Sequence, residues 1–514
     1  MEKFGLPYYY YYVFCLFLAL VVHVVAVVRA KFGAGKKPAG RRLPPGPWQL
    51  PLIGSLHHLL RGLPHHTMRD LAMRHGPLML LRICERAVVV VSSAEAAREL
   101  FTGRGTAFEQ RPGSPAIDEL SRHGMGVIFA PYGEQWRQLR RILVTELLSA
   151  RRVEAFRRVR ADEAARLVSS LASSSPPPGR PVDVGERLAE FVADSSVRAI
   201  FGDRLPDRAA FLRMVRRGVE PSSLFDLRDL FPSSRLVRML PRSGKAERHR
   251  QDMFRLVDDI LQNHEERRMA GDGDDEHDMI DVLLRIQHDD TARVALTPGV
   301  IRAVLTDVFG AALDTSTTTL NWAMAELIAN PRVMAKAQSE IRRVLAGKEE
   351  SEQEMALRDA HYLKAIVKET LRMHPPAPFV PRVCLEDQKI QGYDVPQGTI
   401  VVTNVWAISR DPKYWKDPDR FMPERFEGED ALDLKGSAFE FLPFGAGRRI
   451  CPGINFAQAN VEIALATLLY HFDWEMPLGA KAEETDMTEE FGVTVKRKSE
   501  LLLIPIHRIL HKGE

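Results

Sequence analysis

One cysteine near the carboxyl end lies in a segment whose composition points to metal chemistry. The segment reads Phe444-Gly-Ala-Gly-Arg-Arg-Ile-Cys-Pro-Gly453. A lone cysteine is most often a small buried hydrophobic residue, and for Cys451 alone that alternative stays open. Here, however, the glycines let the backbone approach a flat, bulky group, and Arg448 and Arg449 favour a thiolate over a thiol. One thiolate without a neighbouring Cys or His cannot build a tetrahedral zinc site, but it can be the single axial ligand of a porphyrin-bound iron.

A second group of candidate residues lies within a long predicted helix. Thr297 is a good N-cap, proline suits the first helical position, and Asn330-Pro331 stops the run, so the sequence predicts a helix over Pro298–Ala329. At 1.5 Å per residue this helix is about 48 Å long, enough to traverse a domain. In its middle, four consecutive hydroxyl residues follow Asp314. Their side chains compete for backbone hydrogen bonds, which indicates either a functional site or a bend.

The composition predicts one large globular body. The chain has 514 residues, of which 45 % are hydrophobic and 27 % charged, close to the averages of soluble proteins and unlike a disordered or polytopic membrane chain. A formal net charge of +3 is too small to imply nucleic-acid binding. The four cysteines are far apart, which excludes a disulfide framework and a CxxC metal knuckle. Helical periodicity predominates, and short β-branched runs at Ala87–Val91 and Thr399–Thr403 predict strands, so the fold class is mainly α with a minor β portion.

The N-terminus departs from this soluble pattern. Residues 6–28 are apolar or aromatic except for Pro7 and His23. This segment is long enough to form a membrane-spanning helix. The basic residues that follow have no acid among them: Arg29, Lys31, Lys36, Lys37, Arg41 and Arg42. By the positive-inside rule the remainder of the chain stays in the cytosol. A removed signal peptide is the alternative, although neither its amino-terminal charge nor its cleavage site is clear.

The segment after the apolar run predicts a stiff connection. Leu43-Pro-Pro-Gly-Pro47 disfavours helix and holds the chain extended, so it would set the angle between the body and the membrane. An ordinary proline-rich turn is the alternative.

Four signatures together resemble the cytochrome P450 family over essentially the whole chain. The cysteine segment matches FxxGxRxCxG, Lys-Glu369-Thr-Leu-Arg372 matches its ExxR helix, Pro-Glu-Arg425-Phe matches the arginine that completes a triad with that pair, and Asp314-Thr315 matches its oxygen-activating step. The anchor and proline hinge look like the microsomal branch, and the stretches at Pro44–Leu56 and Glu369–Pro376 are similar to plant members of specialised metabolism. The resemblance implies a cytochrome P450 fold with a membrane anchor over residues 1–30, a basic and proline-rich hinge over 31–51 and one haem-thiolate catalytic domain over 52–514.

The resemblance also implies roles for individual residues. Cys451 would be the axial ligand of haem b, and Thr315 with Asp314 would deliver protons for the activation of O2. Glu369, Arg372 and Arg425 would form a structural triad that locks the cysteine-bearing loop. The remaining haem contacts would be Phe444, Gly447, Arg449, Gly453, Trp136, Arg140 and Arg382, of which the arginines would bind the propionates because their forks match carboxylates.

The substrate is predicted less sharply. By family position an apolar pocket would draw on Ile128, Phe129, Leu305, Phe309, Ala311, Phe379, Val380 and Val493. Such residues suit a hydrophobic substrate but are equally ordinary core. We expect a terpenoid, with an indolic or phenolic precursor as the alternative; this preference is analogy. Ala312 stands where the family usually has Gly, which narrows the groove beside Thr315.

A monooxygenase of this kind needs external electrons. No dinucleotide-binding GxGxxG follows a predicted strand, so the resemblance implies NADPH acting through a flavoprotein reductase in the same membrane, the endoplasmic reticulum. Arg137, Arg141 and Arg448 are the candidate contacts for that partner. A haem-thiolate isomerase or dehydratase acting on hydroperoxides would need no reductase, and a haem sensor or structural membrane protein would show no turnover; both remain alternatives.

Overall fold

A computed structural model describes most of the chain. The described residues are 40–103, 106–113, 125–173, 180–202, 227–239, 244–270, 278–288, 296–428, 432–477, 479 and 481–508. The predicted anchor over residues 1–30 lies outside these ranges, and the predicted hinge is described from residue 40. Within the described ranges, the helices are either too short or too polar to cross a membrane.

The described chain is mainly helical, as predicted. The α-helices are α2 (Leu56–Leu59), α3 (Pro64–His75), α4 (Ala94–Thr102), α6 (Glu134–Ile142), α7 (Ala150–Ala155), α8 (Arg157–Ser173), α9 (Val184–Phe201), α11 (Leu227–Leu230), α12 (Arg235–Arg238), α13 (Gly244–Met269), α14 (Met279–Gln287), α15 (Pro298–Ala329), α16 (Pro331–Leu345), α17 (Glu350–Ala356), α18 (His361–Met373), α19 (Val405–Ile408) and α20 (Ile454–His471). The strands are β1 (Leu78–Ile83), β2 (Arg86–Val91), β3 (Val182–Asp183), β4 (Phe379–Val383), β5 (Gln388–Ile390), β6 (Tyr393–Val395), β7 (Ile400–Asn404), β8 (Phe472–Glu475), β9 (Glu489–Phe491), β10 (Val495–Arg497) and β11 (Leu502–His507).

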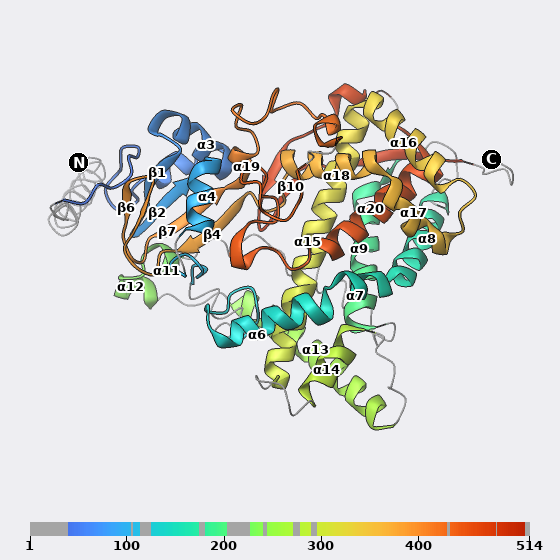
Figure 1. Cartoon of the computed structure of the whole chain (residues 1–514), viewed down its shortest axis with the longest axis horizontal. Coiled ribbons are helices and arrows are strands. Elements are labelled where there is room, and N and C mark those ends of the chain that lie inside the picture. Colours follow the sequence, from blue (N-terminus) through green and yellow to red (C-terminus); the bar gives the residue numbers. More distant parts are fainter. Residues whose placement is uncertain are drawn as a thin grey trace, which may run out of the picture.

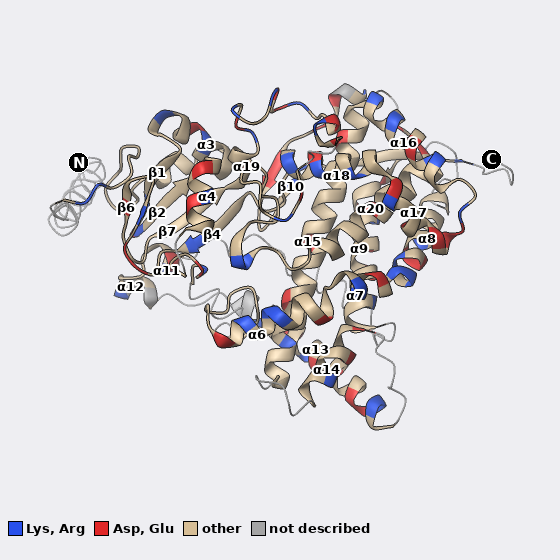
Figure 2. Cartoon of the chain, in the orientation of Figure 1, with Lys and Arg blue, Asp and Glu red and all other residues tan. Residues whose placement is uncertain are grey.

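A four-stranded sheet and a helical body lie on opposite sides of α15 (Figure 1). The sheet has the order β1-β2-β7-β4, in which β2 and β7 are parallel and the other pairs antiparallel. On the other side α15 packs against α9, α18 and α20. The largest buried cluster joins these helices with α16, so the core lies in the helical body. Charged residues are numerous on the outer helices α8, α16 and α17 and sparse through the middle of α15 (Figure 2).

The long helix has the predicted bounds. Thr297 caps its first turn by accepting a hydrogen bond from the Val300 amide at 3.4 Å, and Pro298 occupies the first position. Buried residues occur on every face in its second half, as expected for a helix that crosses a core. The assignment is helical throughout, including the hydroxyl-rich stretch, where Thr315 and Thr319 donate to the carbonyls four residues earlier.

Strands β2, β7 and β4 pair side by side in the four-stranded sheet. β2 and β7 correspond to the two predicted strands with boundaries moved by one residue, and their register pairs Val88 with Ile400. β4 joins the edge of β7, pairing Phe379 with Asn404. This pairing brings the segment that follows α18 alongside the sheet.

The described part of the hinge packs on the sheet. The Leu80 amide donates to Pro45 O at 2.7 Å, and a Cβ at Gly46 would collide with the Leu80 carbonyl. The proline-rich segment is therefore fastened to the body at Leu80, and its predicted role as a stiff connection to a membrane stays a prediction.

Candidate active site

The cysteine loop is a tight backbone structure that ends at a helix. Gly445 and Gly447 both have φ of +73°, a conformation that costs other residues energy. The Cys451 amide donates to Phe444 O at 3.0 Å, and Gly453 is the N-cap of α20. The Gly453 amide lies 3.4 Å from Cys451 Sγ and donates to it. Cys451 is thus held just before a helix N-terminus, where a negative sulfur is favoured.

A cavity of about 330 Å³ is lined by Cys451 and by residues of α15. The α15 residues that line it are Asp307, Val308, Ala311, Ala312, Thr315, Ser316 and Thr319. β4 contributes Phe379, Val380, Pro381 and Arg382, and the cysteine loop contributes Phe444, Gly445, Arg449 and Gly453. Cys451 and Thr315, predicted from separate motifs, therefore line one chamber.

Four arginines also line this cavity: Arg111, Arg140, Arg382 and Arg449. Burial lowers the pKa of all four, to about 9 for Arg382 and about 10 for Arg449. Arg382 and Arg449 are therefore still charged at neutral pH, and Nε of both Arg111 and Arg449 is buried with no partner within the described structure. Buried, under-satisfied guanidinium groups need an anion. The two propionates of a haem have that charge and match the forked geometry of arginine.

The surroundings of Cys451 Sγ also suit the binding of a haem. Burial raises the pKa of the Cys451 thiol, while the hydrogen bond from Gly453 and the charges of Arg140 and Arg111 lower it. The electrostatic help comes from these two arginines rather than from Arg448 and Arg449, as the sequence had suggested. Arg448 is half-exposed and lies 3.5 Å from Glu109. A metal ion that binds the sulfur takes the place of its proton. The residues therefore fit a haem with one thiolate ligand.

Trp136 and Arg449 contact each other at the edge of the cavity. The Arg449 guanidinium lies 4.6 Å from the Trp136 ring centroid, and Arg449 Nη2 donates to Ala130 O at 2.6 Å. Trp136 Nε1 donates to Val127 O at 3.2 Å. Trp136 and Arg140 share one face of α6, as predicted, and both line the cavity.

The acid and the alcohol of α15 face different surroundings. Thr315 lines the cavity, and its hydroxyl donates to Ala311 O at 2.7 Å. The carboxylate of Asp314 accepts a hydrogen bond from Thr494 Oγ1 at 2.6 Å and lies 2.5 Å from Lys496 Nζ. The two residues are adjacent in sequence, but the Asp314 carboxylate is held by Lys496 of β10 and by Thr494, which precedes that strand. Asp314 therefore lies beside the cavity and is not part of its lining.

The predicted triad is formed and buried. Arg372 Nε and Nη2 donate to the two carboxylate oxygens of Glu369 at 2.7 and 2.9 Å, and both side chains are fully buried. Arg425 Nε donates to Glu369 Oε1 at 3.3 Å. Arg372 also binds the carbonyls of Ser409, Pro418 and Arg420. The triad therefore fastens α18 to the segment before the cysteine loop.

Half of the predicted substrate residues line the cavity. Ile128, Ala311, Phe379 and Val380 do. Four others do not: Leu305 and Phe309 are buried in an apolar cluster that also includes the lining residues Trp136 and Phe456, Val493 is exposed, and Phe129 lies outside the lining. For Leu305 and Phe309 the family position was a poor guide because the rotation of α15 turns them toward neighbouring helices, where Phe309 packs on Phe201.

Sequence reasoning missed two charged residues of the site. Asp307 Oδ2 accepts hydrogen bonds from the Val127 and Ile128 amides at 2.7 and 2.9 Å, and burial raises its pKa. It thereby fixes the loop before α6 against α15. Asp307 lies eight residues before Thr315, close to two helical turns, and this spacing was a usable signal. Arg111 had none, because its loop gives no periodic pattern.

Comparisons with known proteins identify the family of this chain. The cytochrome P450 family model matches residues 44–504. The chain is 46 % identical to desmethyl-deoxy-podophyllotoxin synthase of Sinopodophyllum hexandrum, over 92 % of this chain and 93 % of that protein. It is 43 % identical to premnaspirodiene oxygenase of Hyoscyamus muticus, over 90 % and 92 %, and 41 % identical to germacrene A hydroxylase of Barnadesia spinosa, over 95 % and 97 %. A solved zebrafish cytochrome P450 with abiraterone has a TM-score of 0.72 and 25 % identity, covering 87 % of this chain and 99 % of that chain.

A mainly helical fold whose pocket fits a haem with one cysteine thiolate ligand is that of a haem-thiolate protein. The chain belongs to the cytochrome P450 family, and it is a monooxygenase of that family, an oxidoreductase similar to plant members. The predicted family and fold are confirmed.

Proposed function

We propose that this enzyme inserts one oxygen atom of O2 into a terpenoid-like hydrophobic small molecule. The observation that carries the proposal is the single cavity lined by Cys451, Thr315 and apolar side chains of β4 and α15. Relatives named as premnaspirodiene oxygenase and germacrene A hydroxylase support a terpenoid as the substrate class. Bound haem supplies the oxygen-activating chemistry.

The chain's own residues place and protect the reacting group. Cys451 would be the thiolate ligand of the haem iron, and the four cavity arginines would bind the haem propionates. Ile128, Phe379 and Val380 orient an apolar substrate and exclude water. Thr315 offers a hydroxyl inside the cavity and Asp314 a carboxylate beside it, so that a proton can move from the Asp314 side toward the Thr315 hydroxyl through intervening water.

Electrons come from a partner under this proposal. The donor is an NADPH-dependent flavoprotein reductase, and both proteins are held at the endoplasmic reticulum, this one by the segment 1–30. Basic residues lie along α6 (Figure 2), and the sequence of this helix includes Arg137 and Arg141, which are both exposed. Arg137 pairs with Glu134 at 2.7 Å and the half-exposed Arg448 lies 3.5 Å from Glu109, so an acidic partner would compete with these glutamates for the two arginines. Such electron-transfer contacts are small and weak.

A product screen tests the function. Microsomes containing the enzyme and its reductase are given terpenoid hydrocarbons, indoles and phenolic precursors with and without NADPH, and product masses are recorded. We expect a gain of one oxygen that requires NADPH. A new product that is isomeric with the substrate and forms without NADPH would instead assign a haem-thiolate isomerase.

A matched pair of threonine variants tests the cavity hydroxyl. Thr315→Ala should lower product formation by about 10²-fold, the scale of a lost proton-transfer group. Thr306→Ala is the control, because Thr306 makes the same hydrogen bond to the carbonyl four residues earlier on α15 but does not line the cavity.

A further inference from the structure

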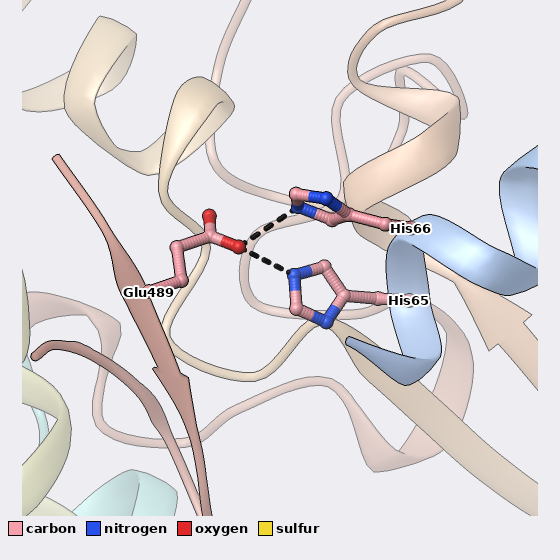
Figure 3. A group of neighbouring side chains, drawn as sticks. All are labelled: His65, His66 and Glu489. Atoms are coloured by element: carbon pink, nitrogen blue, oxygen red, sulfur yellow. Dashed lines mark hydrogen bonds and ion pairs between the residues drawn. The ribbon is translucent and has the colours of Figure 1, made fainter. Parts of the chain in front are cut away.

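Two histidines and a glutamate from opposite ends of the chain meet outside the haem cavity (Figure 3). His65 and His66 lie at the start of α3, and Glu489 begins β9, 424 residues away from His65. Nε2 of His65 and Nε2 of His66 each lie 2.8 Å from the same oxygen, Oε2 of Glu489. The three candidate ligand atoms are all within 4.8 Å of one another.

The contacts of the two imidazoles differ. His65 makes a hydrogen bond to Glu489, whereas His66 Nε2 is buried at the same short distance without forming one. A ligand nitrogen that binds a shared ion points at the ion and not along the line to the neighbouring oxygen. The orientation of His66 thus suits coordination better than direct hydrogen bonding.

Aromatic packing holds both rings in place. His66 stacks on Trp406 with centroids 4.1 Å apart, and His65 stacks on Phe491 at 5.9 Å. The Asn404 side chain donates to His65 O at 2.9 Å, which fixes the backbone at this point. Such support pre-organises a ligand set, because little rotamer freedom is left to lose on binding.

The two histidines differ in their exposure to solvent. The His65 side chain is fully buried, while the His66 side chain is 38 % exposed although its Nε2 atom is buried.

We propose that His65, His66 and Glu489 bind a divalent transition-metal ion of the zinc type. Two imidazoles and one carboxylate are a ligand set that Zn²⁺ takes, with water in the fourth position. Tetrahedral coordination requires the ligand atoms to open from 2.8 Å to about 3.3 Å, a shift that the half-exposed His66 allows. The ion would tie α3 to the β9–β10 hairpin.

That hairpin connects the metal site to the haem cavity. Phe491 lies 6.1 Å from Phe379, a cavity residue, and the Val495 amide donates to Pro376 O at 2.9 Å beside the same wall. A bound ion at Glu489 would therefore stiffen the hairpin that adjoins the substrate chamber.

The test measures zinc binding on full-length, haem-loaded protein that carries no polyhistidine tag. The chain has 16 histidines, so variants rather than stoichiometry decide the outcome. After chelator treatment, Zn²⁺ is titrated by calorimetry into the wild type, His66→Gln, Glu489→Gln and His75→Ala. His66→Gln keeps a hydrogen-bonding group but removes the ligand, and His75 is the third histidine of α3 and lies outside the cluster.

We expect one site whose affinity falls at least about tenfold in His66→Gln and Glu489→Gln, since losing even an outer partner of a metal costs about 10–100-fold. His75→Ala should bind as the wild type does. Zn²⁺ should also slow hydrogen–deuterium exchange over residues 487–499 in the wild type and not in His66→Gln. The ferrous carbon-monoxide spectrum shows whether each variant is folded. Equal zinc affinity in the wild type and His66→Gln would overturn the proposal. The contacts of the two histidines with Glu489 would then join α3 to the hairpin without a metal ion.

Discussion

Lys496 on β10 holds the carboxylate of Asp314 on α15, with Nζ 2.5 Å from Oδ1. Thr494 Oγ1 donates to the other oxygen at 2.6 Å, and Thr318 on α15 lies 3.2 Å from the Thr494 hydroxyl. Because Thr494 has one hydroxyl proton, Thr318 donates to it. The C-terminal hairpin therefore sets the position of the acid that precedes the cavity threonine.

Removal of the lysine should disturb proton delivery more than stability. Lys496 is partly exposed, so Lys496→Gln should cost no more than about 1 kcal/mol of unfolding free energy. We expect product formed per NADPH consumed to fall at least about twofold, because the carboxylate is no longer held beside Thr315. Lys498→Gln, an exposed neighbour, is the control. Equal coupling in both variants would show that Lys496 has no positioning role.

Cys451→Ser should remove the thiolate signature. The ferrous carbon-monoxide complex of the wild type should show the red-shifted Soret band of thiolate ligation, and the variant should lose it, because a serine hydroxyl does not replace a sulfur ligand to iron. Cys384→Ser is a suitable control, since Cys384 is buried elsewhere and donates to Glu386 O, a bond that serine can make. An unchanged spectrum in Cys451→Ser would contradict the assigned ligand.

Glu369→Gln should damage the fold strongly. The substitution leaves Arg372 buried without its counter-charge, a loss of about 3–5 kcal/mol. We expect a lower haem-to-protein ratio and a lower Tm, because the segment before the cysteine loop loses its fastening. Glu190→Gln serves as the matched control: it also pairs with an arginine three residues away, but at a partly exposed site worth about 0–1 kcal/mol. Similar Tm values for the two variants would contradict this role.

Glu462 on α20 should make stability depend on pH. Burial raises its pKa to about 7, above the value of 4.5 expected in the unfolded chain. Between these values the folded state keeps a proton that the unfolded state has lost, so stability falls as pH rises from about 4.5 to about 7 and levels off above. Glu462→Gln should flatten this part of the profile and raise Tm at pH 7.5, and the exposed Glu352→Gln should not. Tm measured at pH 5.5 and 7.5 checks it.

Local sequence patterns predicted the bounds of those helices and strands whose ends are set by residues nearby in the chain. The long helix has its predicted bounds because capping and proline signals act within a few residues. Strands β2 and β7 were found with boundaries one residue off, since pairing partners decide where a strand ends. The pocket was half predicted: Ala311 lines it, whereas Leu305, which the same reasoning chose, packs into a neighbouring cluster.

By itself, the sequence determined the thiolate segment, the Glu369–Arg372 pair and the family, because each depends on residues close together in the chain. Only the tertiary structure decided that Arg111 joins the cavity, that Asp314 pairs with Lys496 and that His65 meets Glu489. The last two of these contacts join distant segments: Asp314 lies 180 residues from Thr494, its other partner beside Lys496, and His65 lies 424 residues from Glu489. No local spacing specifies such contacts, since they depend on how the whole chain packs.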